Sequence, residues 1–206
     1  MAKSYHQYCP IAHALDLVGE RWSLLIVREL VHGPLRYTDL HERLTGCGTN
    51  VLAARLRELE AGGVVRKHKL PPPAASTVYE LTPAGAGLRP VLHALAWWGA
   101  RTLGPPGADV ELHPGWLEPA LHTALALVVQ EGSFEFRVGD EVAHVADGAA
   151  HAGPAAAPDV VIEADPAGFY HLLVGGDMSA ARIRGDRAAL ERLLDSLPTT
   201  KAPLPV

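Results

Sequence analysis

Residues 50–61 carry the side chains whose types and spacing are best suited to chemistry, and the chemistry they suit is base recognition. At about 100° per residue in a helix, three leucines fall on one side and should pack inward: Leu52, Leu56 and Leu59. The opposite side carries Asn50, Ala53, Ala54 and Arg57. Asn pairs with adenine, Arg pairs with guanine or a phosphate, and small alanines permit close approach to a groove. An ordinary solvated amphipathic helix would have the same periodicity.

Basic residues on the next predicted strand, residues 64–70, strengthen the DNA-reading interpretation. This strand carries Arg66, Lys67, His68 and Lys69, and a proline-rich loop, residues 71–76, separates it from a second strand at 78–81. Such a stiff wing can lie along a DNA backbone and supply affinity rather than sequence reading. Arg55 flanks the apolar face, so it could brace the protein, hold a phosphate or read a base. The residues expected at DNA are Arg36, Thr38, Thr49, Asn50, Ala53, Ala54, Arg55, Arg57, Lys67, His68, Lys69 and Ser76.

Helix start and stop signals predict the elements that position these residues. Helices are expected at residues 10–18, 21–31 and 38–44, the last with Thr38 as its cap. Residues 46–48, Gly-Cys-Gly, form the turn, and Thr49 caps the helix that ends at Gly62-Gly63. Pro83 opens a long helix that reaches about residue 103.

That long helix has two lines of apolar residues, one with Leu88, Leu92 and Leu95 and another with Val91 and Trp98. Two apolar faces indicate one for its own core and one for a second copy of the chain. A homodimer also fits proteins that read two half-sites a helical turn apart. The alternative is a single wide core face.

The charge distribution divides the chain in two. Residues 1–104 carry 12 Lys and Arg against 8 Asp and Glu, whereas residues 105–206 carry 6 against 15. A basic half can approach phosphates and an acidic half is repelled by them. Residues 104–107, Gly-Pro-Pro-Gly, cannot continue a helix, so we expect domains at 1–104 and 105–206, with an irregular tail from Pro198.

Residues 9–99 resemble the HxlR family of winged helix-turn-helix transcriptional regulators. The matching segments are Cys9-Pro10, residues 19–22 (Gly-Glu-Arg-Trp), residues 33–40, Leu52 with residues 55–60, residues 79–85 and Trp98-Gly99. The resemblance implies a mostly helical fold with a β-hairpin wing, a homodimer, and insertion of the helix at residues 50–61 into the major groove. It also implies wing contacts near residues 67–77. The Gly-Cys-Gly turn departs from relatives, and the wing lacks an Arg at its tip.

The second half is predicted to be an α+β domain. Helices are expected at residues 114–130, from 166 to Gly175-Gly176, and after Gly185-Asp186, with strands at 134–138, 142–146, 159–164 and 179–184. From residue 158 onward this order resembles the sterol carrier protein type 2 fold, a match that covers roughly residues 112–197. The resemblance implies an apolar tunnel for a lipophilic molecule, lined here by Trp116, Leu121, Phe134, Phe136, Val161, Phe169, Leu173, Met178 and Ile183. For any single residue of this set, an ordinary core position is the better interpretation.

Cysteine and histidine patterns indicate no catalysis and no metal or other cofactor. Only Cys9 and Cys47 are present, too few for a disulfide scaffold and typical of a reducing cytoplasm. The histidines lack zinc-ligand spacing, and no nucleophile elbow or glycine-rich phosphate loop occurs. Cys9 precedes a helix, whose positive end can favour a thiolate. Some HxlR relatives sense oxidants through a matching cysteine, so Cys9 is a redox candidate, and an inert buried thiol is the alternative.

The sequence therefore predicts a cytoplasmic, homodimeric transcriptional regulator that binds double-stranded operator DNA and responds to a lipophilic small molecule held in its second domain. The longest apolar run, at 121–129, is too short to cross a bilayer, and the N-terminus lacks the apolar core of a signal peptide. Two alternatives remain: a redox regulator acting through Cys9, and a lipid-binding carrier whose winged helix serves only to dimerise.

Overall fold

The computed structural model describes residues 4–73, 75–107, 112, 115–125, 128 and 131–197. The chain forms two compact units, residues 1–92 and 93–206. The division falls inside a helix, earlier than the Gly-Pro-Pro-Gly boundary expected from the sequence, because that helix contributes side chains to both cores. No helix in the described part is long and apolar enough to span a membrane.

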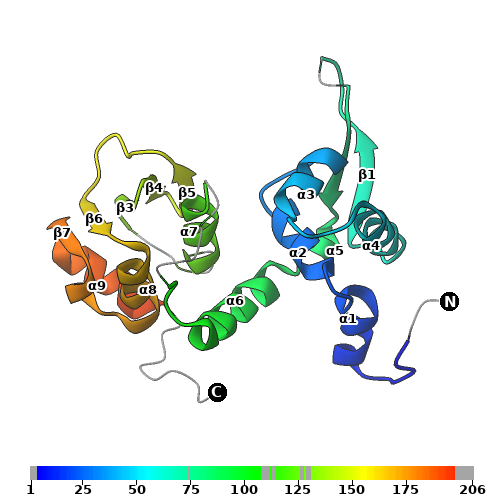
Figure 1. The fold of residues 1–206 in the computed structure, drawn as a ribbon, viewed down its shortest axis with the longest axis horizontal. Helices are drawn as coiled ribbons and strands as arrows, with labels where there is room; N and C mark the ends of the chain where they lie inside the picture. The colour runs from blue at the N-terminus through cyan, green and yellow to red at the C-terminus, as the bar shows by residue number, and fades with distance from the viewer. Residues whose placement is uncertain are drawn as a thin grey trace. The chain divides into compact units, whose positions relative to one another are not determined.

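The first unit is a set of helices followed by a β-hairpin, in the order of a winged helix-turn-helix (Figure 1). Its elements are α1 (Pro10–Val18), α2 (Ser23–Leu30), α3 (Tyr37–Arg43), α4 (Thr49–Ala61), β1 (Val65–Lys69), β2 (Thr77–Leu81) and α5 (Pro83–Ala86). Strands β1 and β2 pair antiparallel, and Leu35 adds a bridge to Tyr79 through both backbone groups. The hairpin projects beyond the helices as the predicted wing (Figure 1).

Apolar packing positions these helices around one core, which α4 joins through its three leucines. Helix α2 begins at Ser23 rather than at the expected Arg21, because Trp22 adopts a left-handed backbone with φ 81°. The single helix expected from Pro83 is instead two, since α5 ends at Ala86 and α6 (Arg89–Leu103) begins after Leu88.

Close backbone contact holds α5 in place. The Thr82 hydroxyl donates to the Gly63 carbonyl oxygen at 2.6 Å and accepts the Gly85 N–H at 3.1 Å. Gly85 is buried directly against the Val64 carbonyl, where no side chain fits. This glycine therefore fixes α5 against the residue that precedes β1.

The second unit packs helices on one face of a five-stranded mixed sheet. The strands are β3 (Phe134–Val138), β4 (Glu141–Ala146), β5 (Ala149–Ala152), β6 (Val160–Ala164) and β7 (Arg182–Gly185), in the spatial order β5-β4-β3-β6-β7. β3 and β6 are parallel and the other neighbours antiparallel. The helices are α7 (Leu117–Leu125), α8 (Pro166–Gly175) and α9 (Arg187–Ser196), with a short 3-10 turn, η1 (Met178–Ala180).

Several boundaries in this unit differ from expectation. Residues 178–180 form η1 instead of the start of a strand, because the Asp177 carboxylate accepts both the Ser179 N–H at 2.9 Å and the Ser179 hydroxyl at 2.6 Å. Helix α7 is shorter than the expected 114–130, several of whose residues lie outside the described part, as does the tail from Pro198. The order strand, helix, strand, helix expected after residue 158 is present.

Replacing Gly85 with alanine is expected to destabilise the first unit. The added Cβ would lie 2.0 Å from the Val64 carbonyl oxygen, a backbone atom that cannot move aside freely. Overpacking of this kind costs about 1–3 kcal/mol, measured by urea unfolding of the full chain. Gly99→Ala is the control, since its Cβ would meet nothing within 4 Å and alanine favours a helix interior. Equal stability of the two variants would contradict this account.

Candidate functional site

Helix α4 presents its predicted polar face to solvent. Leu52, Leu56 and Leu59 are buried in the first core. Thr49, Asn50 and Arg57 are exposed, and Ala53 and Ala54 are half-buried. The inward and outward faces match those expected from the periodicity, while the DNA contacts themselves stay a prediction.

The start of α4 is held by its neighbour α3. The Tyr37 hydroxyl donates to the Thr49 carbonyl oxygen at 2.7 Å, and the Asp39 carboxylate accepts the Arg36 N–H at 3.1 Å. Arg36 rather than Thr38 therefore precedes α3 as its cap, and Gly48 rather than Thr49 precedes α4. Sequence reasoning missed Tyr37 and Asp39, although an acidic residue in the first turn is a common helix-start signal.

Arg55 points toward the protein. Its Nη1 atom lies 2.6 Å from a Glu58 carboxylate oxygen and 3.3 Å from one of Glu20, and its side chain is only 18% exposed. Of the three roles left open by the sequence, these ion pairs support bracing, since they tie α4 to the segment before α2.

The basic strand β1 divides into two pairs. Arg66 forms an ion pair with Glu80, and His68 Nδ1 lies 3.5 Å from the same carboxylate. Lys67 and Lys69 alternate with them and so point to the other face. Lys67 Nζ lies 5.5 Å from the centroid of the Tyr79 ring, and Lys69 is exposed.

Four cations of this surface have no carboxylate partner within the described residues: Arg36, Arg57, Lys67 and Lys69. They come from the start of α3, the middle of α4 and the first wing strand, and all four are exposed. Ser76, at the base of the wing loop, is half-buried, and its backbone carbonyl accepts the Leu70 N–H at 2.8 Å. We call Arg36, Asn50, Arg57, Lys67 and Lys69 the polar surface of the first unit.

In the second unit, most residues predicted to line a tunnel pack against one another in the core. Leu121, Phe134, Phe136, Phe169 and Leu173 are buried there, and Trp116, Met178 and Ile183 pack against them. The Phe169 ring makes edge contacts with Trp116 at 5.6 Å and Phe136 at 6.0 Å between centroids. Val161 is a correction: it lies on the opposite sheet face from Val160 and Ile162, because successive strand residues alternate.

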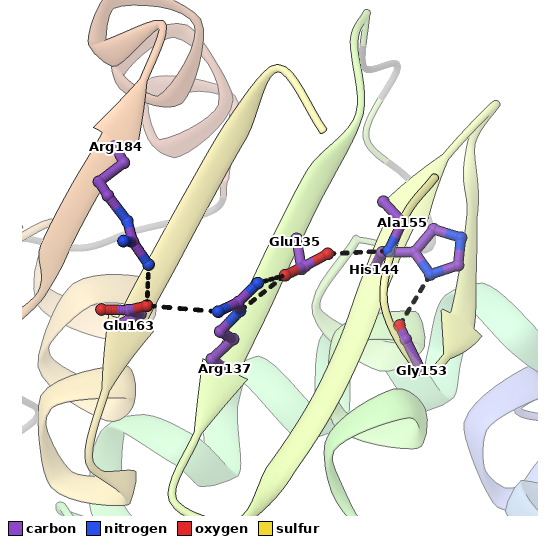
Figure 2. Close-up of polar contacts among 7 residues, drawn as sticks. All are labelled: Glu135, Arg137, His144, Gly153, Ala155, Glu163 and Arg184. Atoms are coloured by element: carbon purple, nitrogen blue, oxygen red, sulfur yellow. Dashed lines mark hydrogen bonds and ion pairs between the residues drawn. The ribbon is translucent and has the colours of Figure 1, made fainter. Parts of the chain in front are cut away.

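That opposite face carries a network of alternating charges (Figure 2). Arg137 donates to Glu135 from Nε at 2.7 Å, and its Nη1 lies 3.6 Å from Glu163, which also pairs with Arg184. The free oxygen of Glu135 accepts the Ala155 N–H at 2.9 Å. Figure 2 shows the three strands β3, β6 and β7 contributing these groups side by side.

The network fastens the chain segment between β5 and β6 to the sheet. Besides the Ala155 bond, the His144 ring donates from Nδ1 to the Gly153 carbonyl oxygen at 2.9 Å. Glu135 is 2% exposed. Burial alone raises the pKa of the Glu135 carboxyl. The hydrogen bonds from Arg137 and Ala155 and the charge of Arg137 together lower this pKa by more, so it lies below its ordinary value. These groups are satisfied by one another, which indicates a structural role.

The two cysteines differ in surroundings. Cys9 is half-buried at the N-terminal end of α1, where it is the cap residue but its side chain accepts no capping hydrogen bond. Cys47 is buried in the turn before α4, and this burial raises the pKa of its thiol. Because the thiolate is the reactive form, this raised pKa makes Cys47 a poor nucleophile.

The first unit's sequence matches known regulators. A family model described as HxlR-like helix-turn-helix matches residues 17–106. The uncharacterized HTH-type transcriptional regulator sll1512 of Synechocystis sp. is 36% identical over 107 residues, 52% of this chain and 79% of that protein. The HTH-type transcriptional regulator YodB of Bacillus subtilis is 34% identical over 91 residues, 44% of this chain and 81% of that protein.

Two solved structures are similar over part of the chain. The reduced form of the transcriptional regulator YodB from B. subtilis has a TM-score of 0.41 and 32% identity, covering 46% of this chain and 94% of its own. The redox regulator HypR in its reduced form has a TM-score of 0.41 and 26% identity, covering 44% of this chain and 90% of its own.

Replacing Glu135 with glutamine is expected to lower stability in a pH-dependent way. Because the folded-state pKa is depressed, the ionised carboxylate contributes stability above the unfolded pKa of about 4.3, and this contribution is lost as pH falls through the folded-state pKa. Losing the charge-assisted bonds should cost about 1–3 kcal/mol at pH 7 and less below pH 4, measured by urea unfolding at each pH.

The matched control for Glu135 is Glu191→Gln. Glu191 pairs with Arg187 at 3.7 Å on an exposed face of α9, and such surface pairs contribute only about 0–1 kcal/mol. A destabilisation by Glu135→Gln that is the same at pH 7 and pH 4 would show that lost packing, rather than lost charge, is responsible.

Proposed function

The chain belongs to the HxlR-like helix-turn-helix family of transcriptional regulators, and we propose that it binds operator DNA as a homodimer that places one α4 in the major groove of each half-site. The observation that carries this proposal is the exposed face of α4. Asn50 and Arg57 flank the small Ala53 and Ala54 there, and the Tyr37 bond to the Thr49 carbonyl holds the start of the helix. A helix whose start is held in place and whose exposed face carries small side chains can reach base edges.

The side chains of the polar surface suit different parts of DNA. Asn50 has both a donor and an acceptor and suits an adenine edge, while Arg57 suits guanine or a phosphate. Lys67 and Lys69 on the wing suit phosphates, which fix register and affinity without reading sequence. Arg66 and His68 share Glu80, so they contribute less net charge to DNA than the sequence alone would indicate.

Exposed apolar side chains support a second copy of the chain as partner. On α6, Val91, Leu95 and Trp98 follow one another at helical spacing and are 51%, 45% and 58% exposed. On α1, Ile11 and Leu15 are also exposed. Contiguous exposed apolar side chains mark interaction surfaces, and a two-fold dimer matches the two half-sites of an operator. Leu92 of α6 and Leu88 just before it pack against the first core, whereas Leu95, expected on the same line of the helix, is exposed with Val91 and Trp98.

The second unit, in this proposal, holds the small molecule that controls DNA binding. Helix α6 begins in the first unit and continues into the second, so one helix belongs to both. Control requires that the molecule bind the DNA-competent and DNA-incompetent states with different affinity. The assignment of this unit to the sterol carrier type stays a prediction.

A second candidate is control through Cys9. It is favoured by the contrast between a half-exposed thiol at the positive end of α1 and a buried Cys47 with a raised pKa. Electrophile or oxidant attack at Cys9 would then take the place of ligand binding as the regulatory event.

Truncating Asn50 or Arg57 to alanine is expected to weaken operator binding about tenfold or more, because a good base contact is worth about 1–3 kcal/mol. A duplex selected from a random pool by the wild-type protein serves as the operator. Affinity is measured by fluorescence anisotropy, and native mass spectrometry of the complex is expected to give two chains per duplex.

Arg192→Ala is the charge-matched control for Arg57→Ala, because Arg192 is an exposed arginine on α9 of the second unit. It should leave operator affinity within about twofold. If Arg57→Ala and Arg192→Ala weaken binding equally, the effect is general electrostatics and α4 is not the reading helix. Unchanged affinity in both Asn50→Ala and Arg57→Ala would favour the carrier-protein alternative.

Alkylation of the native protein by iodoacetamide is expected to label Cys9 well before Cys47. Burial both shields the Cys47 sulfur and keeps it protonated, whereas Cys9 is accessible. Peptide mass spectrometry over a time course measures the two rates, and urea should equalise them. Faster labelling of Cys47 in the native protein would contradict the packing around the turn before α4. Loss of operator binding on Cys9 labelling would favour thiol control.

A further inference from the structure

One face of α6 in the second unit lines a cavity that the sequence did not single out. His93, Ala94, Trp97, Trp98 and Arg101 recur at the spacing of successive helical turns. Together with Val128 and Ser196 they line a pocket of about 440 Å³ that is partly open to solvent. Small-molecule sites fall in the range of about 300–1,000 Å³ and are typically apolar and aromatic with a few polar groups. None of the nine residues predicted to bind a ligand lines this cavity.

Two polar groups of this cavity have hydrogen-bond partners, and one buried group has none in the described part of the chain. The Trp97 indole N–H donates to His93 Nε2 at 3.1 Å, and the Ser196 hydroxyl donates to the Leu193 carbonyl oxygen at 2.5 Å. The Nε atom of Arg101 is buried and has no hydrogen-bond partner among the described residues. Arg101 as a whole is only half-buried, so the remaining N–H groups of its guanidinium are the ones that a bound acceptor could reach.

Charge and shape specify the acceptor. The described lining residues include the Arg101 guanidinium and no carboxylate, so the pocket favours an anionic ligand over a cationic one. A guanidinium matches the two oxygens of a carboxylate in geometry as well as in charge. Trp97 and Trp98 supply indole surface, which favours planar ring systems over flexible chains of the same area.

We propose that this cavity binds an aromatic monocarboxylate, with its rings against Trp97 and Trp98 and its carboxylate on Arg101. This site gives the effector of the proposed function a binding place on α6 and a chemical class. Its role in regulation rests on the proposed function, whereas the binding itself does not. It replaces the core residues of the sheet as the expected contact set for a small molecule.

The test is isothermal titration calorimetry of the full-length protein, without DNA, with 2-naphthoate and its neutral isostere 2-naphthamide. We expect one site per chain and a naphthoate affinity at least tenfold above that of the amide, a difference of about 1.4 kcal/mol. Arg101→Met, which keeps an apolar stem, is expected to bring naphthoate down to the affinity of the amide. Arg187→Met on exposed α9 removes the same charge and should change neither affinity.

A second variant keeps the test decisive if Arg101→Met does not fold, which circular dichroism would reveal. Ala94 is exposed on the same face of α6, so Ala94→Trp should fill the cavity without disturbing a core and abolish binding of both probes. Equal affinity for naphthoate and amide, no effect of either variant, or no heat at millimolar naphthoate would overturn the site.

Operator affinity measured with and without saturating naphthoate separates this site from the proposed function. A shift that Ala94→Trp removes would support both. Naphthoate that binds but leaves operator affinity unchanged would support the site and overturn its role as the effector site. Failure of naphthoate binding together with intact operator binding would overturn the site and leave DNA recognition standing.

Discussion

Burial of the leucine face of α4 is the constraint on which the DNA-facing surface depends. Leu52, Leu56 and Leu59 are essentially inaccessible to solvent, so rotating the helix by one residue would expose apolar area worth several kcal/mol at about 25 cal/mol per Å². The rotation of α4 is therefore fixed by its buried side, and the direction of Asn50 and Arg57 is a consequence. Arg55 and Tyr37 then fix the tilt and the start of the helix, which apolar packing leaves less well determined.

In the second unit, ion pairs rather than apolar packing hold a segment of the chain in place. The face of β3 that lacks helices carries Glu135 and Arg137, and a buried carboxylate there would be costly without compensation. Arg137 and the Ala155 N–H provide that compensation. The segment that leads from β5 to β6 is thereby held over the sheet, which places the parallel strand β6 beside β3. A polar network thus helps to hold the connection from β5 to β6, which passes β4 and β3 in the sheet order.

Sequence periodicity and breaker residues sufficed for most elements and for the faces of α4, since these depend on local spacing. They failed where a distant backbone or side chain decides. The helix expected from Pro83 is interrupted at Gly87 and Leu88, after Gly85 has packed against Val64, and Asp177 turns residues 178–180 into a 3-10 turn. Strand β5 is rich in alanine, which has low strand propensity, so only the Asp147-Gly148 turn before it could have signalled a hairpin. The pairing of Arg66 with Glu80 needed the strand register.

The sides of helix α6 have different roles. Leu92 packs against the first core, as does Leu88 just before the helix, and Trp97 packs into the second. Val91, Leu95 and Trp98 remain exposed. An amphipathic pattern read from sequence alone merges these roles, because every one of them uses the same residue types. Arg101, one turn after Trp97, distinguishes the proposed site from a simple core. Its Nε atom is buried without a partner among the described residues, which is unfavourable in a core, whereas His93 is hydrogen-bonded to Trp97.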